Sequence, residues 1–424
     1  MTIQQIHDIF LRSSEVSIDT RTLKKDALFF AIKGDNFDGN KFAEQAISSG
    51  AKIAVIDNPK YASENTILVK DSLQTLQELA NFHRNYLKVP IIALTGSNGK
   101  TTSKELINAV LSTQFNCFAT KGNLNNHLGV PLTLLSMSKE TEIGIVEMGA
   151  NHHGEIANLC DIAQPDYGYI TNFGKAHLEG FGSVEGVVKA KSELYDHLRS
   201  NNKIAFVNYN DPKQIKQSSG LKQYTFSSAN DNDSTIVFYK AAPYVSVKYN
   251  GEIINSNLIG DYNFSNIAAA ITIGKYFKVT TENIATAISN YTPTNNRSQI
   301  INIKNNTVIL DAYNANPTSM KAALSSFENL NLPHKNSAIF LGDMFELGTD
   351  SHKEHQEIID LLEQSNSETI IVFGDHFSKT KFSDKINSFK STEEAKDIIT
   401  SIQDAKILIK GSRGMKLEKI LDLF

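Results

Sequence analysis

An α/β fold with three domains is predicted by the chain length, the alternation of strand and helix patterns, and the positions where that alternation breaks. At roughly 150 residues per domain, 424 residues correspond to two to four domains, each large enough for its own core. Short apolar runs rich in β-forming residues alternate with helical patterns, as in sheets covered by helices. We expect the domains to span residues 1–88, 89–297 and 298–424.

The N-terminal domain is predicted to be a small α/β unit. Two short apolar runs end in Gly or Asp and read as strands, ALFFAIKG and KIAVID. The helical pattern FAEQAISSGA lies between them, and a second helix, SLQTLQELANFHRNYLK, is expected to end near Lys88, before Pro90. The first boundary is therefore placed at that point.

The central domain is predicted to be a doubly wound parallel sheet. Its first strand, VPIIALTG, is apolar throughout, as suits a buried parallel strand, and it leads through a Gly-containing loop into a helix. Further apolar runs follow, with helical patterns between them: IGIVEMG, YGYITNFG and KIAFVN. A polar stretch over residues 227–260 alternates with period two and predicts a β-meander added to this sheet.

The C-terminal domain is predicted to be a second, Rossmann-like α/β unit. It contains four short strands separated by helical segments: TVILDAYNANP, SAIFLGDM, TIIVFGD and AKILIKGSRG. In such folds, functional loops follow the carboxyl ends of the strands.

Composition excludes several classes of protein. The 42 Lys and Arg residues nearly balance 46 Asp and Glu residues, so a nucleic-acid coat is not expected. No apolar run reaches the ~18 residues of a membrane helix, so no integral membrane segment is expected. Two cysteines form no disulfide framework, and the N-terminus lacks signal-peptide features, so we expect a cytoplasmic protein.

The strongest local signal is the segment TGSNGKTT, between a predicted strand and a predicted helix. Its glycines allow backbone N–H groups to surround phosphate oxygens, Lys100 can neutralise their charge, and the Thr101 hydroxyl can reach Mg²⁺. Leu94 replaces the first Gly of the strict pattern, and the alternative is a Gly-rich turn with an exposed lysine. The strand and helix context favours a nucleoside triphosphate site.

Four other residues are weaker candidates. Glu147 and Asp311 each end a predicted strand, where a carboxylate can meet a metal or a ribose hydroxyl, although a loop cap or an Asx turn is the alternative. His177 follows a strand on the same sheet edge, but a lone His is more often structural. Lys191 lies in a helical pattern where a solvated lysine is the default.

In their order along the whole chain, these segments resemble the Mur ligases. DTRTLKKDALFFAIKGDNFDGNKF is similar to the family's uridine-nucleotide-binding domain, TGSNGKTTS to its ATP loop, and EMGANHHGEI and TNFGKAHLEGFGS to its metal-binding loops. DAYNANPTSM, LGDMFELG and KGSRGM resemble its C-terminal ligase domain. DAYNANPTSM and GNLNNHLGVP resemble the branch that adds D-alanyl-D-alanine rather than the third peptide residue.

The resemblance implies roles for particular residues. Lys100 and Thr101 would hold the β- and γ-phosphates within a loop that also includes Gly96, Ser97, Asn98, Gly99 and Thr102. The implied magnesium ligands are Thr101, Glu147, His177 and a carbamylated Lys191. The remaining nucleotide-binding residues would be Asn263 and Asn266 near the adenine, Arg297 near the phosphates and Asp311 at the ribose. Substrate contacts would come from Thr20, Arg21, Asn126, Asn314 and Asn316, and Lys175 stands where many relatives carry an acid.

The implied activity is ATP-dependent addition of D-alanyl-D-alanine to UDP-N-acetylmuramoyl-tripeptide, a step of peptidoglycan precursor synthesis for the cell wall. It would proceed through an acyl phosphate with two Mg²⁺ ions, in a monomeric enzyme. Lys100, His177, Lys191 and Arg297 would carry the chemistry. Two alternatives remain at this point: a folylpolyglutamate-type ligase, which should lack the uridine-binding domain, and a non-catalytic nucleotide-binding switch, which would not need Glu147, His177 and Lys191 together.

Overall fold

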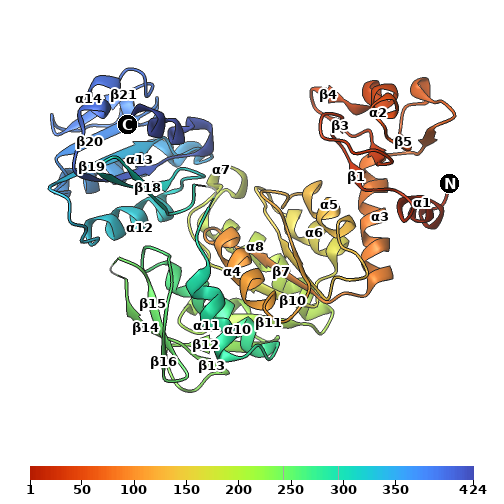
Figure 1. Ribbon diagram of the computed structural model, residues 1–424, viewed down its shortest axis with the longest axis horizontal. Coiled ribbons are helices and arrows are strands. Elements are labelled where there is room, and N and C mark those ends of the chain that lie inside the picture. Colours follow the sequence, from red (N-terminus) through yellow and green to blue (C-terminus); the bar gives the residue numbers. More distant parts are fainter. Residues whose placement is uncertain (242, 295) are drawn as a thin grey trace.

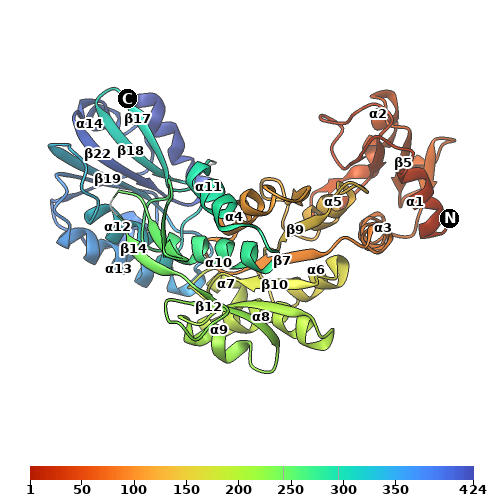
Figure 2. The same ribbon diagram turned by 60° about the horizontal axis from the view of Figure 1, so that its bottom comes forward.

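The structure is a computed structural model and describes residues 1–241, 243–294 and 296–424. Three α/β units follow one another along the chain, and the central unit lies between the other two (Figures 1 and 2). Within the described residues, no helix combines the length and the apolar character needed to cross a membrane.

The N-terminal unit is a four-stranded parallel sheet in the order β1-β2-β5-β6. Its strands are β1 (Val16–Ser17), β2 (Leu28–Phe30), β5 (Ile53–Ile56) and β6 (Thr66–Leu68), and a hairpin comprises β3 (Lys33–Gly34) and β4 (Phe37–Asp38). Its helices are α1 (Ile3–Phe10), α2 (Ala43–Ser48) and α3 (Ser72–Leu87). The sequence predicted only β2 and β5 among these strands, because β1 and β6 have two and three residues and show no readable alternation.

The central unit is a seven-stranded parallel sheet in the order β13-β12-β11-β10-β7-β9-β8. The strands are β7 (Ile91–Thr95), β8 (Cys117–Ala119), β9 (Ile143–Glu147), β10 (Tyr167–Ile170), β11 (Ile204–Asn208), β12 (Lys222–Ser227) and β13 (Ser234–Thr235). Its helices are α4 (Lys100–Leu111), α5 (Gly129–Leu135), α6 (Glu155–Ala163), α7 (Leu178–Phe181), α8 (Val184–Ser200), α9 (Pro212–Gln217), α10 (Asn263–Tyr276) and α11 (Thr281–Asn290). Every residue of β7 and β9 is buried, as their continuous apolar sequences predict.

The predicted meander is present, but it is not an extension of the central sheet. It forms a separate antiparallel sheet of β14 (Val237–Lys240), β15 (Ser246–Tyr249) and β16 (Glu252–Asn255). Its inner side chains Val247, Tyr249 and Ile254 join the hydrophobic cluster that contains residues of α10 and α11. This sheet therefore packs its apolar face on helices and does not pair with the central sheet.

The C-terminal unit is a six-stranded sheet in the order β17-β18-β22-β19-β20-β21, parallel except for β17. The four predicted strands are β18 (Asn306–Asp311), β19 (Asn336–Gly342), β20 (Thr369–Phe373) and β22 (Ala405–Lys410); β17 (Gln299–Ile303) and β21 (Ile386–Phe389) were not predicted. The helices are α12 (Pro317–Glu328), α13 (Ser351–Gln364) and α14 (Lys396–Ser401). Both additional strands are edge strands with partly exposed residues, so their sequences are less apolar.

Candidate active site

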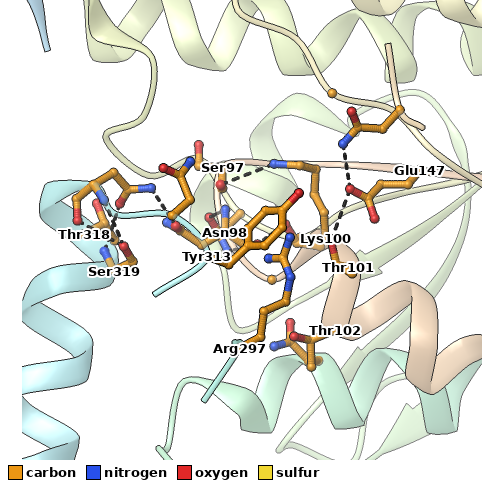
Figure 3. A pocket seen from close by; sticks show the side chains of 18 of the residues that line it. Ser97, Asn98, Lys100, Thr101, Thr102, Glu147, Arg297, Tyr313, Thr318 and Ser319 are labelled. Atoms are coloured by element: carbon orange, nitrogen blue, oxygen red, sulfur yellow. Dashed lines mark hydrogen bonds between the residues drawn. The ribbon is translucent and has the colours of Figure 1, made fainter. Parts of the chain in front are cut away.

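A cavity of about 900 Å³ lies between the central and C-terminal units. The central unit contributes the loops that follow β7, β9, β10 and β11, because the carboxyl ends of parallel strands meet at one sheet edge. The C-terminal unit contributes the ends of β18 and β22 and the start of α12. Figure 3 shows the loop from Ser97 to Thr102 facing Tyr313, Thr318 and Ser319 across this cavity.

The phosphate loop has a fixed backbone. Gly99 has φ of 78°, and a Cβ there would lie 2.5 Å from Asn266 Oδ1, so this position requires glycine. The backbone N–H of Asn98 donates to Asn172 Oδ1 at 3.1 Å, and that of Ser97 donates to the Asn172 carbonyl at 3.0 Å. Lys100 Nζ donates back to the Gly96 carbonyl at 2.6 Å, and burial lowers the pKa of its ammonium group. The loop thus presents a lysine and a helix N-terminus to the cavity.

Glu147 is a buried carboxylate at the end of β9, with 1% of its surface exposed. Its Oε1 accepts hydrogen bonds from Asn125 Nδ2 at 2.8 Å and from Thr101 Oγ1 at 3.3 Å (Figure 3). Its Oε2 has no hydrogen-bond partner within the described part of the chain, and Lys104 Nζ lies 3.8 Å away. A buried carboxylate oxygen without a hydrogen bond favours binding of a cation.

Lys191 on α8 is 1% exposed, which corrects the default expectation of a solvated side chain. Its Nζ donates to the Ala150 carbonyl at 3.1 Å and lies 5.0 Å from the centre of the Phe181 ring. Burial, and then the nearby charge of Lys100, lower the pKa of Lys191 to about 7. A substantial fraction of this amine is therefore neutral at physiological pH.

His177 lies at the N-terminal end of α7, with φ of 53°. Its Nδ1 is 2.5 Å from Glu346 Oε2, a residue of the C-terminal unit, and this contact lowers the pKa of the Glu346 carboxyl. His177 lines the cavity, but in this arrangement it contacts a carboxylate of the other unit and not Lys191. In the part of the chain that the structure describes, no three His, Cys, Asp or Glu side chains are grouped as a metal site.

Two charged contacts form the C-terminal side of the cavity. Lys410, buried at the end of β22, is 2.5 Å from Asp311 Oδ2, and Asp311 Oδ1 accepts the Ser298 backbone N–H at 3.1 Å. The guanidinium carbon of Arg297 lies 3.7 Å from the centre of the Tyr313 ring, and its buried Nε has no hydrogen-bond partner within the described chain.

Asn263 and Asn266 are both buried on α10, which packs on α4. Asn266 accepts a hydrogen bond from Ser103 Oγ at 3.0 Å and donates to Asn263 Oδ1 at 2.8 Å. Asn266 therefore supports the first turns of α4, directly after the phosphate loop, and Asn263 holds Asn266. Both residues also line the cavity.

The structure brings most of the predicted site residues together. The cavity is lined by Ser97, Asn98, Gly99, Lys100, Thr101, Thr102, Asn126, Glu147, His177, Asn263, Asn266, Arg297, Asp311, Asn314 and Asn316. Lys191 lies behind its wall, bonded to the lining residue Ala150, and Gly96 forms the buried base of the phosphate loop. Thr20 and Arg21 do not line this cavity; they lie in the N-terminal unit, where Arg21 forms an ion pair with Asp19 at 2.6 Å.

Several residues that line the cavity were not predicted from the sequence. Asn125 and Asn172 hold Glu147 and the phosphate loop, and Lys410 holds Asp311. Asn316 was predicted as a substrate contact, yet its Nδ2 donates to Asn98 Oδ1 at 2.7 Å across the two units. The one available signal was position, because Asn172 and Lys410 both stand at the carboxyl ends of apolar strands.

Three family descriptions match this chain. Residues 12–84 match "Mur ligase family, catalytic domain", residues 94–274 match "Mur ligase middle domain", and residues 296–413 match "Mur ligase, glutamate ligase domain". UDP-N-acetylmuramoyl-tripeptide–D-alanyl-D-alanine ligase of Bacillus subtilis is 35% identical over 96% of this chain and 92% of its own length.

Solved structures agree with these matches. A crystal structure of MurF from Acinetobacter baumannii has a TM-score of 0.88 at 28% identity, covering 100% of this chain and 98% of the other. MurF ligase from Thermotoga maritima in complex with ADP has a TM-score of 0.85 at 27% identity, covering 98% of both chains. The similarity extends through all three units.

Proposed function

This chain belongs to the Mur ligase family, and we propose from that premise that it joins D-alanyl-D-alanine to UDP-N-acetylmuramoyl-tripeptide while ATP is converted to ADP and phosphate. The product is the UDP-linked pentapeptide used in peptidoglycan synthesis. The observation that carries this proposal is the cavity in which the phosphate loop of the central unit faces Arg297, Asp311 and Lys410.

The phosphate loop supplies what activation of a carboxylate needs. A carboxylate does not react with an amine until its oxygen becomes a good leaving group, and transfer of the γ-phosphoryl group forms an acyl phosphate that provides one. Lys100 and the N-terminal amides of α4 would neutralise phosphate charge, and Asp311 would accept a hydrogen bond from a ribose hydroxyl; both residues line the cavity. We assign Asn263, Asn266 and Arg297 to the same nucleotide site.

The residues present fit magnesium at one position and, after a rearrangement, at a second. Thr101 and Glu147 would hold the first ion; Thr101 Oγ1 lies 3.3 Å from Glu147 Oε1. His177 and a carbamate formed from the Lys191 amine and CO₂ would hold the second, provided that His177 leaves Glu346. When bound, the ions would supply positive charge to the transferring phosphoryl group.

The remaining assignments concern the substrates and the domains. Thr20 and Arg21 would contact the uridine nucleotide, and Asn126, Asn314 and Asn316 would contact the peptide substrates near the cavity. We place the domain boundaries after Lys88 and Arg297, next to α3 and β17. A monomeric enzyme in the cytoplasm is part of the same proposal.

The test is phosphate release measured with each substrate omitted in turn. The proposal requires that release from ATP depends on both UDP-N-acetylmuramoyl-tripeptide and D-alanyl-D-alanine. Nucleotide binding without turnover under any of these conditions would favour the non-catalytic switch. Turnover with a folate and glutamate instead would favour the folylpolyglutamate-type ligase.

A further inference from the structure

Tyr313, which lines the cavity, contacts two arginines. The guanidinium carbons of Arg297 and Arg413 lie 3.7 and 5.1 Å from the centre of its ring, and Arg413 Nη1 donates a hydrogen bond to the Tyr313 hydroxyl at 3.2 Å. Tyr313 and Arg297 line the cavity between the units. The exposed side chain of Arg413 is therefore fixed beside the cavity by a stacking contact and a hydrogen bond.

The backbone at Arg413 is also fixed. The preceding residue, Ser412, is buried; its N–H donates to the Asp343 carbonyl at 3.2 Å, and its hydroxyl accepts the Phe345 N–H at 3.0 Å. A Cβ at Gly414 would lie 2.8 Å from the ring of Phe345, which is 39% exposed. Arg413 thus lies beside an exposed apolar ring on the same side of the C-terminal sheet.

The other cations around the cavity already have partners or assigned roles. Lys410 contacts Asp311 and the Asn314 carbonyl, and Lys100 belongs to the phosphate loop. Arg413 has no carboxylate within ion-pair distance in the described ranges. Arginine presents a planar set of N–H donors that matches a carboxylate, so a free arginine at this place is suited to a carboxylate ligand.

We propose that Arg413, positioned by Tyr313, binds the terminal carboxylate of the incoming dipeptide; this inference rests on the function proposed above. The dipeptide amine is neutral in the attacking step, so at that step the carboxylate is the one full charge of the dipeptide. Two extended residues span roughly 7 Å, which lets an amine enter the cavity from a carboxylate held at its edge. The exposed Phe345 ring is available to the methyl side chains.

The test compares D-alanyl-D-alanine with its C-terminal carboxamide in the wild type, Arg413→Ala, Arg413→Lys and Tyr313→Phe. Losing a charge-assisted contact is expected to lower kcat/KM by roughly 10- to 100-fold. The wild type should therefore prefer the acid over the amide by that factor, and Arg413→Ala should have a kcat/KM lower by the same factor and use the two dipeptides about equally. Arg413→Lys should keep part of the preference, and Tyr313→Phe should weaken it because the hydrogen bond to Arg413 is lost.

Lys419→Ala is the matched control, since it removes one exposed positive charge from the same C-terminal segment and should change nothing. The KM values for ATP and for the UDP-linked substrate should stay within about twofold of wild type in every variant. An unchanged acid preference in Arg413→Ala, or a raised KM for ATP instead, would overturn the dipeptide site while leaving the ligase function intact. A wild type that turns over neither dipeptide would instead overturn the ligase function itself.

Discussion

Lys100 is the residue whose substitution tests the proposed nucleotide site most directly. Its ammonium group donates a hydrogen bond to the Gly96 carbonyl within its own loop, and Lys100 lines the cavity. Binding a phosphate requires only that this group exchange a carbonyl for a phosphate oxygen. We therefore expect the fold to be stable without the Lys100 ammonium group.

Lys100→Ala is therefore expected to abolish ligation and leave the fold intact. Removing a cation that faces transferring phosphoryl oxygens costs on the order of 10²–10³ in rate. Turnover and circular dichroism should be measured on the same preparation. Activity within a few-fold of wild type would show that the loop does not position the transferred phosphate.

Lys191 offers a sharper test because its amine is buried without a carboxylate partner among the described residues. Lys191→Ala should be nearly inactive, and acetate in the medium should partly restore turnover by replacing the carbamate. Lys189→Ala, on the exposed face of the same helix, is the control and should be active without acetate. The absence of rescue, together with electron density that ends at a bare amine in a magnesium- and nucleotide-loaded crystal, would leave Lys191 as a simple cation.

Arg21 tests the substrate assignment outside the cavity. Its exposed guanidinium group is paired only with Asp19 in the described structure, so losing it should not disturb the fold. Arg21→Ala is expected to raise the KM for the UDP-linked substrate about tenfold, with little change in the KM for ATP. An equal rise for both substrates would place the uridine nucleotide elsewhere.

At the scale of elements, helix α3 joins the N-terminal unit to the central one. Arg84 on α3 contacts Asp166 of the central unit at 2.7 Å. His83 Nε2 donates to the Met137 carbonyl at 3.0 Å, and His83 Nδ1 therefore accepts from His7 Nε2 of α1 at 3.0 Å. Both imidazoles are 2% exposed. Burial lowers the pKa of each, and the neighbouring His83 lowers that of His7 further, against an opposing effect of Asp8.

These two histidines should make stability depend on pH. Because their pKa values are lower in the folded state, the unfolded chain binds more protons below about pH 6.5, and the folded state loses stability as pH falls through that range. At pH 7.5, the free energy of unfolding of His7→Phe should be about 1 kcal/mol lower than that of wild type, because the hydrogen bond to His83 is lost. Between about pH 7.5 and 5.5, the Tm of His7→Phe should fall less than the Tm of wild type. The exposed His152→Gln is the control; an equal Tm change in His7→Phe and wild type would exclude the histidine pair as the cause.

At the scale of the whole molecule, the loop after β10 holds the C-terminal unit against the central one. Lys175 Nζ is 2.6 Å from Glu354 Oε1, and Glu354 is 2% exposed. The Lys175 backbone N–H donates to Thr318 Oγ1 at 3.0 Å. His177, two residues after Lys175, contacts Glu346. These contacts cross between the two walls of the cavity, so they set its width.

Breaking the Lys175–Glu354 pair should impair turnover without touching a substrate. Glu354→Lys leaves two cations together and should lower kcat about tenfold, because their repulsion separates the two walls of the cavity. The double variant Lys175→Glu with Glu354→Lys should recover most of that loss. The same exchange at Lys321 and Glu357, both within the C-terminal unit, is the control and should have little effect in either form. Additive losses in the double variant would exclude a direct pair.

The features that could be predicted from the sequence are those encoded by short continuous segments of the chain. Buried strands such as β7 and β9 are mostly apolar runs, and TGSNGKTT specifies its own turn, so these central strands, the phosphate loop and the strand-end positions of Glu147 and Asp311 were predicted. Edge strands β17 and β21 were not predicted, and the meander was predicted as an addition to the central sheet, because partly exposed strands carry weak patterns and pairing partners are chosen by packing. The contacts of His177 with Glu346, Lys410 with Asp311 and Arg413 with Tyr313 join residues about 100 or more positions apart. Only the folded chain brings those residues together. Asp311 and Lys410 end neighbouring strands of one sheet, whereas His177 and Glu346 lie in loops of two different units, and no local spacing encodes either pairing.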